Sequence, residues 1–168
     1  QMCIRDSARR LRYNQSDDVW IPVDGATWHN TFKYLPPETY KTEHPKWYSG
    51  DGTQLCFLAH GDEAEAEELY QTLLAKLISC LEEYPDRQNI TITQEDKRTW
   101  CDCAACKENL QKYGTDAATV VQFCNRIAED VEKYFAEKNS SRQVNICFFA
   151  YHMTTNAPVI KNADGSYS

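Results

Sequence analysis

The sequence predicts an α/β fold, on the strength of three observations. Two long segments, near residues 62–85 and 116–135, repeat apolar side chains at helical spacing. Two short segments, residues 90–93 and 144–150, are rich in apolar or β-branched residues, as strands are. With a short strand before residue 48, the order is strand, helix, strand, helix, strand. This alternation implies parallel strands joined by right-handed crossovers.

Composition indicates the class of protein. The chain has 168 residues, of which 42% are hydrophobic and 26% charged, which is typical of one globular domain. Its 18 Lys and Arg against 25 Asp and Glu leave a net charge of -7, so we expect no nucleic-acid partner. A small neutral or hydroxyl-rich partner fits this charge better. No apolar run approaches the roughly 18–20 residues that span a bilayer, so we expect no membrane insertion.

The N-terminal part of the chain is predicted to be irregular. Residues 1–18 are interpreted as a poorly defined segment, and residues 1–7 as a cloning or assembly remnant, so the domain proper covers residues 19–168. From residue 19 to residue 48, aromatic residues alternate with prolines, which favours loops and short strands. The whole chain is interpreted as a fragment of a longer protein.

The first predicted helix begins after Asp62. The segment Asp62-Glu63-Ala64-Glu65 has the form of a capping box, with acidic residues in the positively polarised first turn. Pro85 ends the helix. A second amphipathic helix is predicted to begin near Asp116, after Gly114. Apolar residues form a continuous stripe on each helix, as expected of helices that pack on a core: Ala66, Leu69, Tyr70, Leu73, Leu74, Leu77, Ile78 and Leu81, then Ala117, Val120, Val121, Cys124, Ile127 or Ala128, Val131, Tyr134 and Phe135.

The two later strands indicate where chemistry would lie. Residues 90–93 form a short predicted strand, followed by a polar turn over residues 94–99. Residues 144–150 are apolar at nearly every position, which is typical of a strand covered by helices on both faces. In α/β folds, functional residues gather where strands end and loops begin. The segments that follow Ile92 and Phe149 are therefore the main candidates.

Two adjacent carboxylates follow the first of these strands. Glu95 and Asp96 could act as general acid, general base or substrate orienter, with pKa values separated by unequal environments. The alternative is a solvated acidic loop. Because adjacent residues tend to point to opposite sides, only one of the two is expected to face a pocket.

A cysteine run follows the carboxylates. Cys101, Cys103 and Cys106 could place three sulfur atoms around one metal ion, and Zn²⁺ would need a fourth ligand from elsewhere. The alternatives are a disulfide that pins the loop, or three plain thiols. Cysteines on apolar faces, Cys80, Cys124 and Cys147, are interpreted as small core residues. The candidates for the fourth ligand are Cys56, Cys147, His60 and His152.

Histidine and aromatic residues lie near the predicted strand ends. His29 follows the possible first strand, and Tyr151 and His152 follow the last one. Either histidine could hydrogen-bond a sugar hydroxyl or titrate near neutral pH, although a purely structural hydrogen bond is the alternative for each. The sequence has no Gly-rich phosphate loop, no Gly-x-Ser-x-Gly and no His-Glu-x-x-His. It therefore argues against nucleotide hydrolysis, serine hydrolysis and zincin-type proteolysis.

An ordered set of short motifs runs through roughly residues 25–155. The motifs are His29-x-Thr31-Phe32, His44-Pro45-x-Trp47-Tyr48, Asp51-Gly52, Gln54-Leu55-Cys56, Gln94-Glu95-Asp96, Trp100-Cys101-x-Cys103-x-x-Cys106, Phe123-x-Asn125-x-Ile127-Ala128 and Ala150-Tyr151. This set resembles the domain of unknown function 4838 family. Glu95 stands where that family usually has Asn.

The resemblance implies a fold and an activity. Members of the family are bacterial, are often associated with polysaccharide breakdown, and look like glycoside hydrolases related to hexosaminidase and α-glucuronidase domains. It therefore implies a partial (β/α)8 TIM barrel of the glycoside hydrolase type, as a fragment of a larger barrel, acting on a glycan by carboxylate acid/base catalysis. The implied catalytic residues are Asp96 and Glu95. The implied substrate-binding residues are His29, Tyr151, Trp100, Gln94 and His152.

Two other functions stay open at this stage. One is a glycan-binding domain without catalysis, and the other is a metal or redox site at Cys101, Cys103 and Cys106. No cofactor is required for the hydrolase interpretation, although a structural zinc at the cysteine run is a further expectation. Eight cysteines would suit an exported protein, but thiols on helix faces need no disulfide. We therefore expect a bacterial protein that is either exported, to the periplasm or the outside of the cell, or cytoplasmic.

Overall fold

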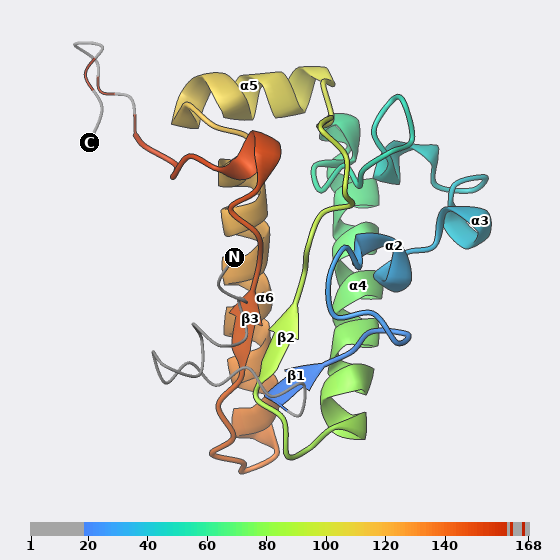
Figure 1. The fold of residues 1–168 in the computed structure, drawn as a ribbon, viewed down its shortest axis with the longest axis vertical. Coiled ribbons are helices and arrows are strands. Elements are labelled where there is room, and N and C mark those ends of the chain that lie inside the picture. Colours follow the sequence, from blue (N-terminus) through green and yellow to red (C-terminus); the bar gives the residue numbers. More distant parts are fainter. Residues whose placement is uncertain (1–18, 161, 163–165, 167–168) are drawn as a thin grey trace, which may run out of the picture.

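The structure is a computed structural model that describes residues 19–160, 162 and 166 (Figure 1). The expectations for residues 1–18, including the remnant at 1–7, lie outside the described residues. Three short strands form one parallel sheet in the order β1-β2-β3. The strands are β1 (Trp20–Ile21), β2 (Asn89–Thr91) and β3 (Asn145–Cys147).

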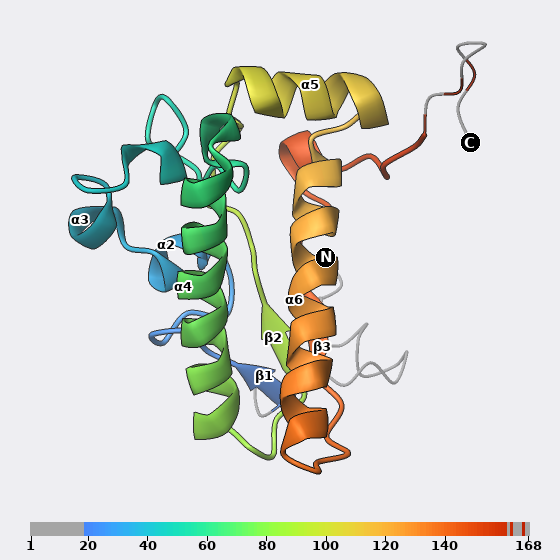
Figure 2. The same cartoon turned by 180° about the vertical axis from the view of Figure 1, so that it is seen from behind.

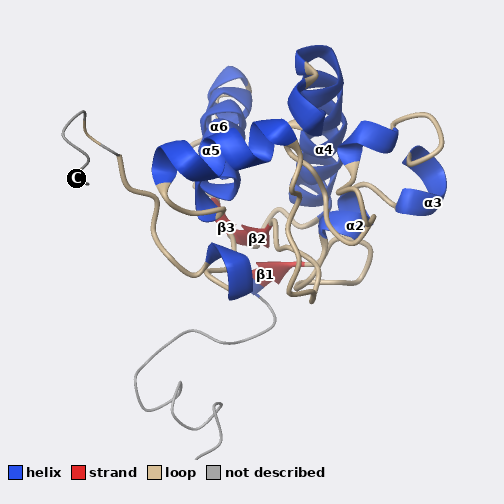
Figure 3. Cartoon of the chain, turned by 90° about the horizontal axis from the view of Figure 1, so that it is seen from above, coloured by secondary structure: helices blue, strands red, loops and turns tan. Residues whose placement is uncertain are grey.

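Two long helices connect the strands. These are α4 (Glu63–Glu83), which leads from β1 to β2, and α6 (Ala117–Glu137), which leads from β2 to β3. They lie side by side on the same face of the sheet (Figures 2 and 3). The shorter helices are α2 (Thr31–Tyr34), α3 (Pro37–Tyr40) and α5 (Ala104–Tyr113), and α5 crosses the top of the long helices in the view of Figure 1.

The register of the sheet explains which face the helices cover. Ile21 pairs with Ile90, and Ile90 pairs with Ile146, so three isoleucines form one row across the strands. This row belongs to the core that α4 and α6 complete. The next row holds Asn89 and Asn145, whose side-chain amides hydrogen-bond each other at 2.8 Å. Alternate side chains point to opposite faces of a sheet, so the apolar row selects the face that the helices bury.

The sequence correctly predicts both long helices. Asp62 caps α4, and its side chain accepts a hydrogen bond from the backbone N–H of Glu65 at 3.2 Å. Gly114 separates α5 from α6 in the left-handed conformation, with φ of 74°. The predicted apolar stripes are buried between the helices and the sheet. The strand, helix, strand, helix, strand order is also confirmed.

The expected TIM barrel is wrong for the described part of the chain. A (β/α)8 barrel closes eight strands inside a ring of helices. Here three strands of two or three residues form an open sheet with β1 and β3 at its edges, and both long helices lie on one face. The periodicity of the sequence predicts only that strands and helices alternate. The expectation of a barrel was implied by the resemblance alone.

Three local expectations also need correction. The strand predicted over residues 144–150 shortens to β3, and it is not covered on both faces, because Asn145 and Phe148 are exposed. Residues 19–48, expected to form loops and short strands, also contain α2 and α3. The cysteine run, interpreted as a loop, begins α5. None of the described helices is long and apolar enough to cross a membrane.

Candidate functional site

The loops that follow the three strands meet at the carboxyl edge of the sheet. Parallel strands place all their carboxyl ends at one edge, so residues distant in sequence become neighbours there. We call one group of neighbouring side chains the edge cluster. It consists of His29 from the loop after β1, Gln94 and Asp96 from the loop after β2, and Tyr151 and His152 from the loop after β3.

Gln94 joins the three loops from a buried position. Its carbonyl oxygen lies 2.7 Å from His29 Nδ1, and its Nε2 donates to the carbonyl of Tyr151 at 2.7 Å. Its Oε1 accepts a hydrogen bond from Thr154 Oγ1 at 3.1 Å. Both ends of the amide are therefore used within the protein. Gln94 holds the edge cluster together, which differs from the substrate contact that the resemblance implies.

Asp96 is the exposed carboxylate of the edge cluster. The hydroxyl of Tyr151 donates to Asp96 Oδ1 at 2.9 Å, and His152 Nε2 lies 3.8 Å from the same oxygen. The hydrogen bond to Asp96 raises the pKa of Tyr151, so the phenol keeps its proton and acts as a donor. The rings of Tyr151 and His152 are in contact, with centroids 3.7 Å apart. The exposed Asp96 carboxylate is therefore held by a side chain from a neighbouring strand end.

Aromatic rings border this carboxylate. Trp28 stacks on Phe149 with ring centroids 5.5 Å apart, and it is 45% exposed. The ring of His29 packs edge-on against Phe149, and its centroid lies 5.9 Å from the ring centroid of Tyr151. The rings come from the loop after β1 and the segment after β3, so their arrangement depends on the sheet. Together they form a chain of ring contacts that reaches Asp96 through Tyr151.

Glu95 points away from Asp96. Its Oε1 accepts hydrogen bonds from Thr31 Oγ1 at 2.8 Å and from the backbone N–H of Phe32 at 2.9 Å. Its backbone is held by the side chain of Gln54, which donates to the Glu95 carbonyl and accepts from the Glu95 N–H, both at 3.0 Å. Glu95 therefore ties the loop after β2 to the start of α2. The two adjacent carboxylates occupy separate environments.

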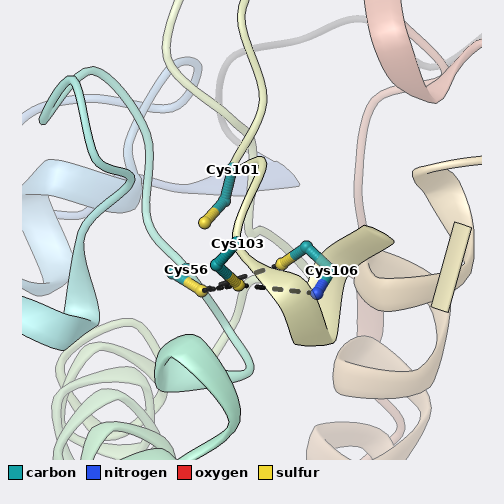
Figure 4. Close-up of side chains that lie close together, drawn as sticks. All are labelled: Cys56, Cys101, Cys103 and Cys106. Atoms are coloured by element: carbon teal, nitrogen blue, oxygen red, sulfur yellow. Dashed lines mark hydrogen bonds between the residues drawn. The ribbon is translucent and has the colours of Figure 1, made fainter. Parts of the chain in front are cut away.

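A second group of side chains lies away from the edge cluster. We call Cys56, Cys101, Cys103 and Cys106 the cysteine cluster. Their four sulfur atoms all lie within 4.8 Å of one another (Figure 4). Cys56 Sγ is 3.7 Å from Cys106 Sγ and 3.9 Å from Cys103 Sγ. All four thiols are free, and three of them are buried.

Mutual hydrogen bonding couples these thiols. The bonds from Cys106 and Cys56 lower the pKa of Cys101, whereas the bond to Cys101 raises the pKa values of Cys56 and Cys106. Four thiols at these distances could hold a soft metal ion.

Comparison with protein families identifies the chain. A family model described as Domain of unknown function (DUF4838) matches residues 5–165, which is nearly the whole sequence. The chain belongs to the DUF4838 family. No curated protein and no solved structure matches it. Because the family description states no activity, the function of this DUF4838 chain has to be argued from its sites.

The structure of the DUF4838 chain leaves three expected residues outside both clusters. Trp100, expected to border a cleft, is half-buried against the core, with Phe57 as a ring neighbour at 6.5 Å. His60 turns its Nε2 to the carbonyl of Tyr48 at 2.8 Å. Cys147 lies on β3, where its Sγ contacts the Asn145 carbonyl at 3.8 Å. Among the proposed fourth ligands, Cys56 alone joins the three other cysteines.

The sequence did not indicate that Asn30 connects two of the loops. It is fully buried, and its Nδ2 donates to the carbonyl and hydroxyl oxygens of Thr91 at 3.1 and 2.9 Å. Its Oδ1 accepts from the N–H and hydroxyl of Thr93 at 3.0 and 3.1 Å. Asn30 thus fastens the loop after β1 to the end of β2. No local pattern marks this role, because Thr91 and Thr93 lie more than 60 positions away.

A cavity of about 290 Å³ lies apart from the edge cluster. It lies between α4 and α6, and its wall includes Phe57, Tyr70 and Phe123. Arg126, one of the charged side chains in its wall, packs over the ring of Tyr70 and pairs with Glu67 at 2.8 Å. The positive charge of this cavity is therefore paired within its own wall. The edge cluster, with its exposed carboxylate, is the better candidate for a ligand site.

Proposed function

We propose that the edge cluster binds a carbohydrate. The observation that carries the proposal is the exposed Asp96 carboxylate, held by Tyr151, whose ring is linked through Phe149 to the exposed Trp28. Sugar hydroxyls donate hydrogen bonds to carboxylates, and the flat apolar faces of sugar rings pack on aromatic rings. A negatively charged chain also favours a neutral, hydroxyl-rich ligand over an anionic one.

Residues of the edge cluster and their neighbours Trp28 and Glu95 have distinct tasks in this proposal. Asp96 and Tyr151 would contact sugar hydroxyls, and Trp28 would pack on the sugar ring. Gln94 and Glu95 act as positioning residues, because their polar atoms are hydrogen-bonded to the three loops. The backbone of His29 has a φ of 50° and that of His152 a φ of 51°. Non-glycine residues in this conformation are concentrated at functional sites, which is consistent with a ligand site here.

Glycoside hydrolysis is a second candidate, which the resemblance implies. One observation favours it: the Asp96 carboxylate has both a phenol and an imidazole from the next strand end close to one oxygen. A carboxylic acid in such a position can transfer a proton to a leaving group. Glu95 is a poor partner in this reaction, because its Oε1 is used by Thr31 and Phe32.

The substitution Asp96→Asn tests the two candidates. If Asp96 is the general acid, hydrolysis of a soluble oligosaccharide should fall by about 10²–10⁴-fold with little loss of binding. If the site only binds, the intact protein should bind oligosaccharides without releasing reducing ends, and the variant should bind more weakly. Asp86→Asn, at the amino end of β2, is the matched control and should leave both measurements unchanged. Absence of binding and of hydrolysis across a broad oligosaccharide panel would contradict both candidates.

The substitution Trp28→Ala tests the stacking surface. Aromatic packing contributes about 0.5–1.5 kcal/mol, so we expect oligosaccharide affinity to fall by about two- to tenfold. Isothermal titration calorimetry would measure this change. Tyr84→Ala, which removes an aromatic ring beyond the end of α4, should bind like the wild type. Equal affinity of the Trp28 variant and the wild type would remove Trp28 from the site.

A further inference from the structure

We propose that Cys56, Cys101, Cys103 and Cys106 bind one zinc ion as a structural site. This inference is independent of the carbohydrate proposal, because the cysteine cluster and the edge cluster share no residue. Cysteine thiolates are preferred ligands of zinc, and four of them make the closed tetrahedral site that is typical of structural zinc.

The distances between the sulfur atoms match this geometry. Four sulfur atoms about 2.3 Å from a zinc ion at the corners of a tetrahedron lie about 3.8 Å from one another. Cys56 Sγ is 3.7 Å from Cys106 Sγ and 3.9 Å from Cys103 Sγ, and all four sulfur atoms lie within 4.8 Å. The four thiols are therefore already grouped around one point, and they are not arranged as two separate disulfides.

The surrounding backbone suits negatively charged sulfur atoms. The N–H of His60 points to Cys56 Sγ at 3.3 Å, and the N–H of Cys106 points to Cys103 Sγ at 3.4 Å. Hydrogen bonds of this kind stabilise ligands from outside the coordination sphere. Cys103 is also the N-cap of α5, so the positive end of that helix faces the cluster. These contacts would offset part of the negative charge of four thiolates.

The fold brings the fourth ligand from a separate segment. Three cysteines come from the start of α5 and the residues before it, whereas Cys56 precedes α4 (Figure 4). The turn after Cys56 has left-handed backbone at Ala59 and His60, with φ of 41° and 58°, and it directs the His60 N–H to the sulfur. Leu58 packs against the cluster. Because all four positions would be filled by protein, the ion would cross-link the two segments and would not act as a catalyst.

Such a cross-link would also support the edge cluster. Gln54 lies two residues before Cys56, and it holds Glu95 through two hydrogen bonds. Thr53 Oγ1 lies 2.6 Å from Thr99 Oγ1, close to Cys101. Residues 53–56 thus contact residues 95–101, and zinc would join the last residue of each segment, Cys56 and Cys101. The loop that carries Asp96 begins in this contact.

Metal analysis of the protein purified under reducing conditions tests the site directly. We expect about one zinc ion per chain. Cobalt added to the metal-free protein should produce the visible and charge-transfer bands of a tetrahedral four-thiolate site. A reduced protein that takes up neither zinc nor cobalt would overturn the proposal. Two disulfides among these four cysteines in fresh, unoxidised protein would also overturn it.

Two matched variants test the assignment of the ligands. Cys56→Ser removes the ligand from the separate segment and should weaken zinc binding more than tenfold, whereas Cys147→Ser, a thiol outside the cluster, should keep one zinc ion. Equal zinc affinity of the two variants would contradict the assignment.

If Cys56→Ser does not fold, alkylation of the wild type provides the decision. Zinc should protect these four cysteines from iodoacetamide, and a chelator should expose them, as mapped by mass spectrometry. Alkylation of the four that is equal with and without zinc would overturn the proposal.

Discussion

Removal of zinc is expected to lower the melting temperature of this protein by about 8–16 °C. A ligand present at a thousand times its Kd stabilises the folded state by about 4 kcal/mol. For a domain of about 150–250 residues, each kcal/mol changes the melting temperature by about 2–4 °C. The effect is large because the ion would link the segment before α4 to the start of α5. Thermal unfolding followed by circular dichroism, with and without excess chelator, measures the difference.

The cysteine variants make this prediction specific. Cys147→Ser should respond to the chelator as the wild type does, because that thiol lies on β3 outside the cysteine cluster. Cys56→Ser should already melt at a lower temperature, and the chelator should lower it little further. A wild-type melting temperature that the chelator does not change would mean that the ion contributes nothing to the folded state.

Replacing Asn30 by Ala should destabilise the folded protein by about 3 kcal/mol. The substitution leaves the N–H and the hydroxyl of Thr93 without their buried side-chain partner, and each unsatisfied group costs about 1–3 kcal/mol. The loss should lower the urea midpoint in an equilibrium unfolding experiment. Because Asn30 holds the loop that carries His29, weaker oligosaccharide binding should accompany it.

Asn125→Ala is the matched control for this prediction. Asn125 lies exposed on α6, so the same change in side chain should alter stability by no more than about 0.5 kcal/mol. If the Asn30 and Asn125 variants unfolded at the same urea concentration, the Asn30 hydrogen bonds would contribute no net stability.

The two long helices could be predicted because their signals are local. The cap at Asp62 and the apolar stripe of α4 lie within one stretch of sequence, and the same holds for α6. The sequence also predicted the positions of β2 and β3 to within a few residues, but it did not predict which of their faces are covered by helices. Residues 144–150 are apolar, yet β3 covers only Asn145–Cys147, and Asn145 and Phe148 are exposed. An apolar run indicates a strand but not how many of its faces are covered.

The candidate site was predicted in part. The positions after the strands indicated the edge where Gln94, Asp96 and Tyr151 meet, because parallel strands align their carboxyl ends. The sequence also predicted that Glu95 and Asp96 would point to opposite sides, but not which of them would lie in the edge cluster. Glu95 binds the start of α2 and Asp96 binds Tyr151, and these partners lie more than 50 positions away in the sequence.

The sequence by itself determined the two long helices, their order between strands, and the run of three cysteines. These features depend on periodicity and on spacing between near neighbours. Only the tertiary structure decided that the sheet is open, that Asn30 fastens two strand ends, and that Cys56 is the fourth thiol. The physical reason is the same in each case. Contacts between distant segments depend on how the helices pack on one another and on the sheet. Short-range sequence patterns do not predict that packing.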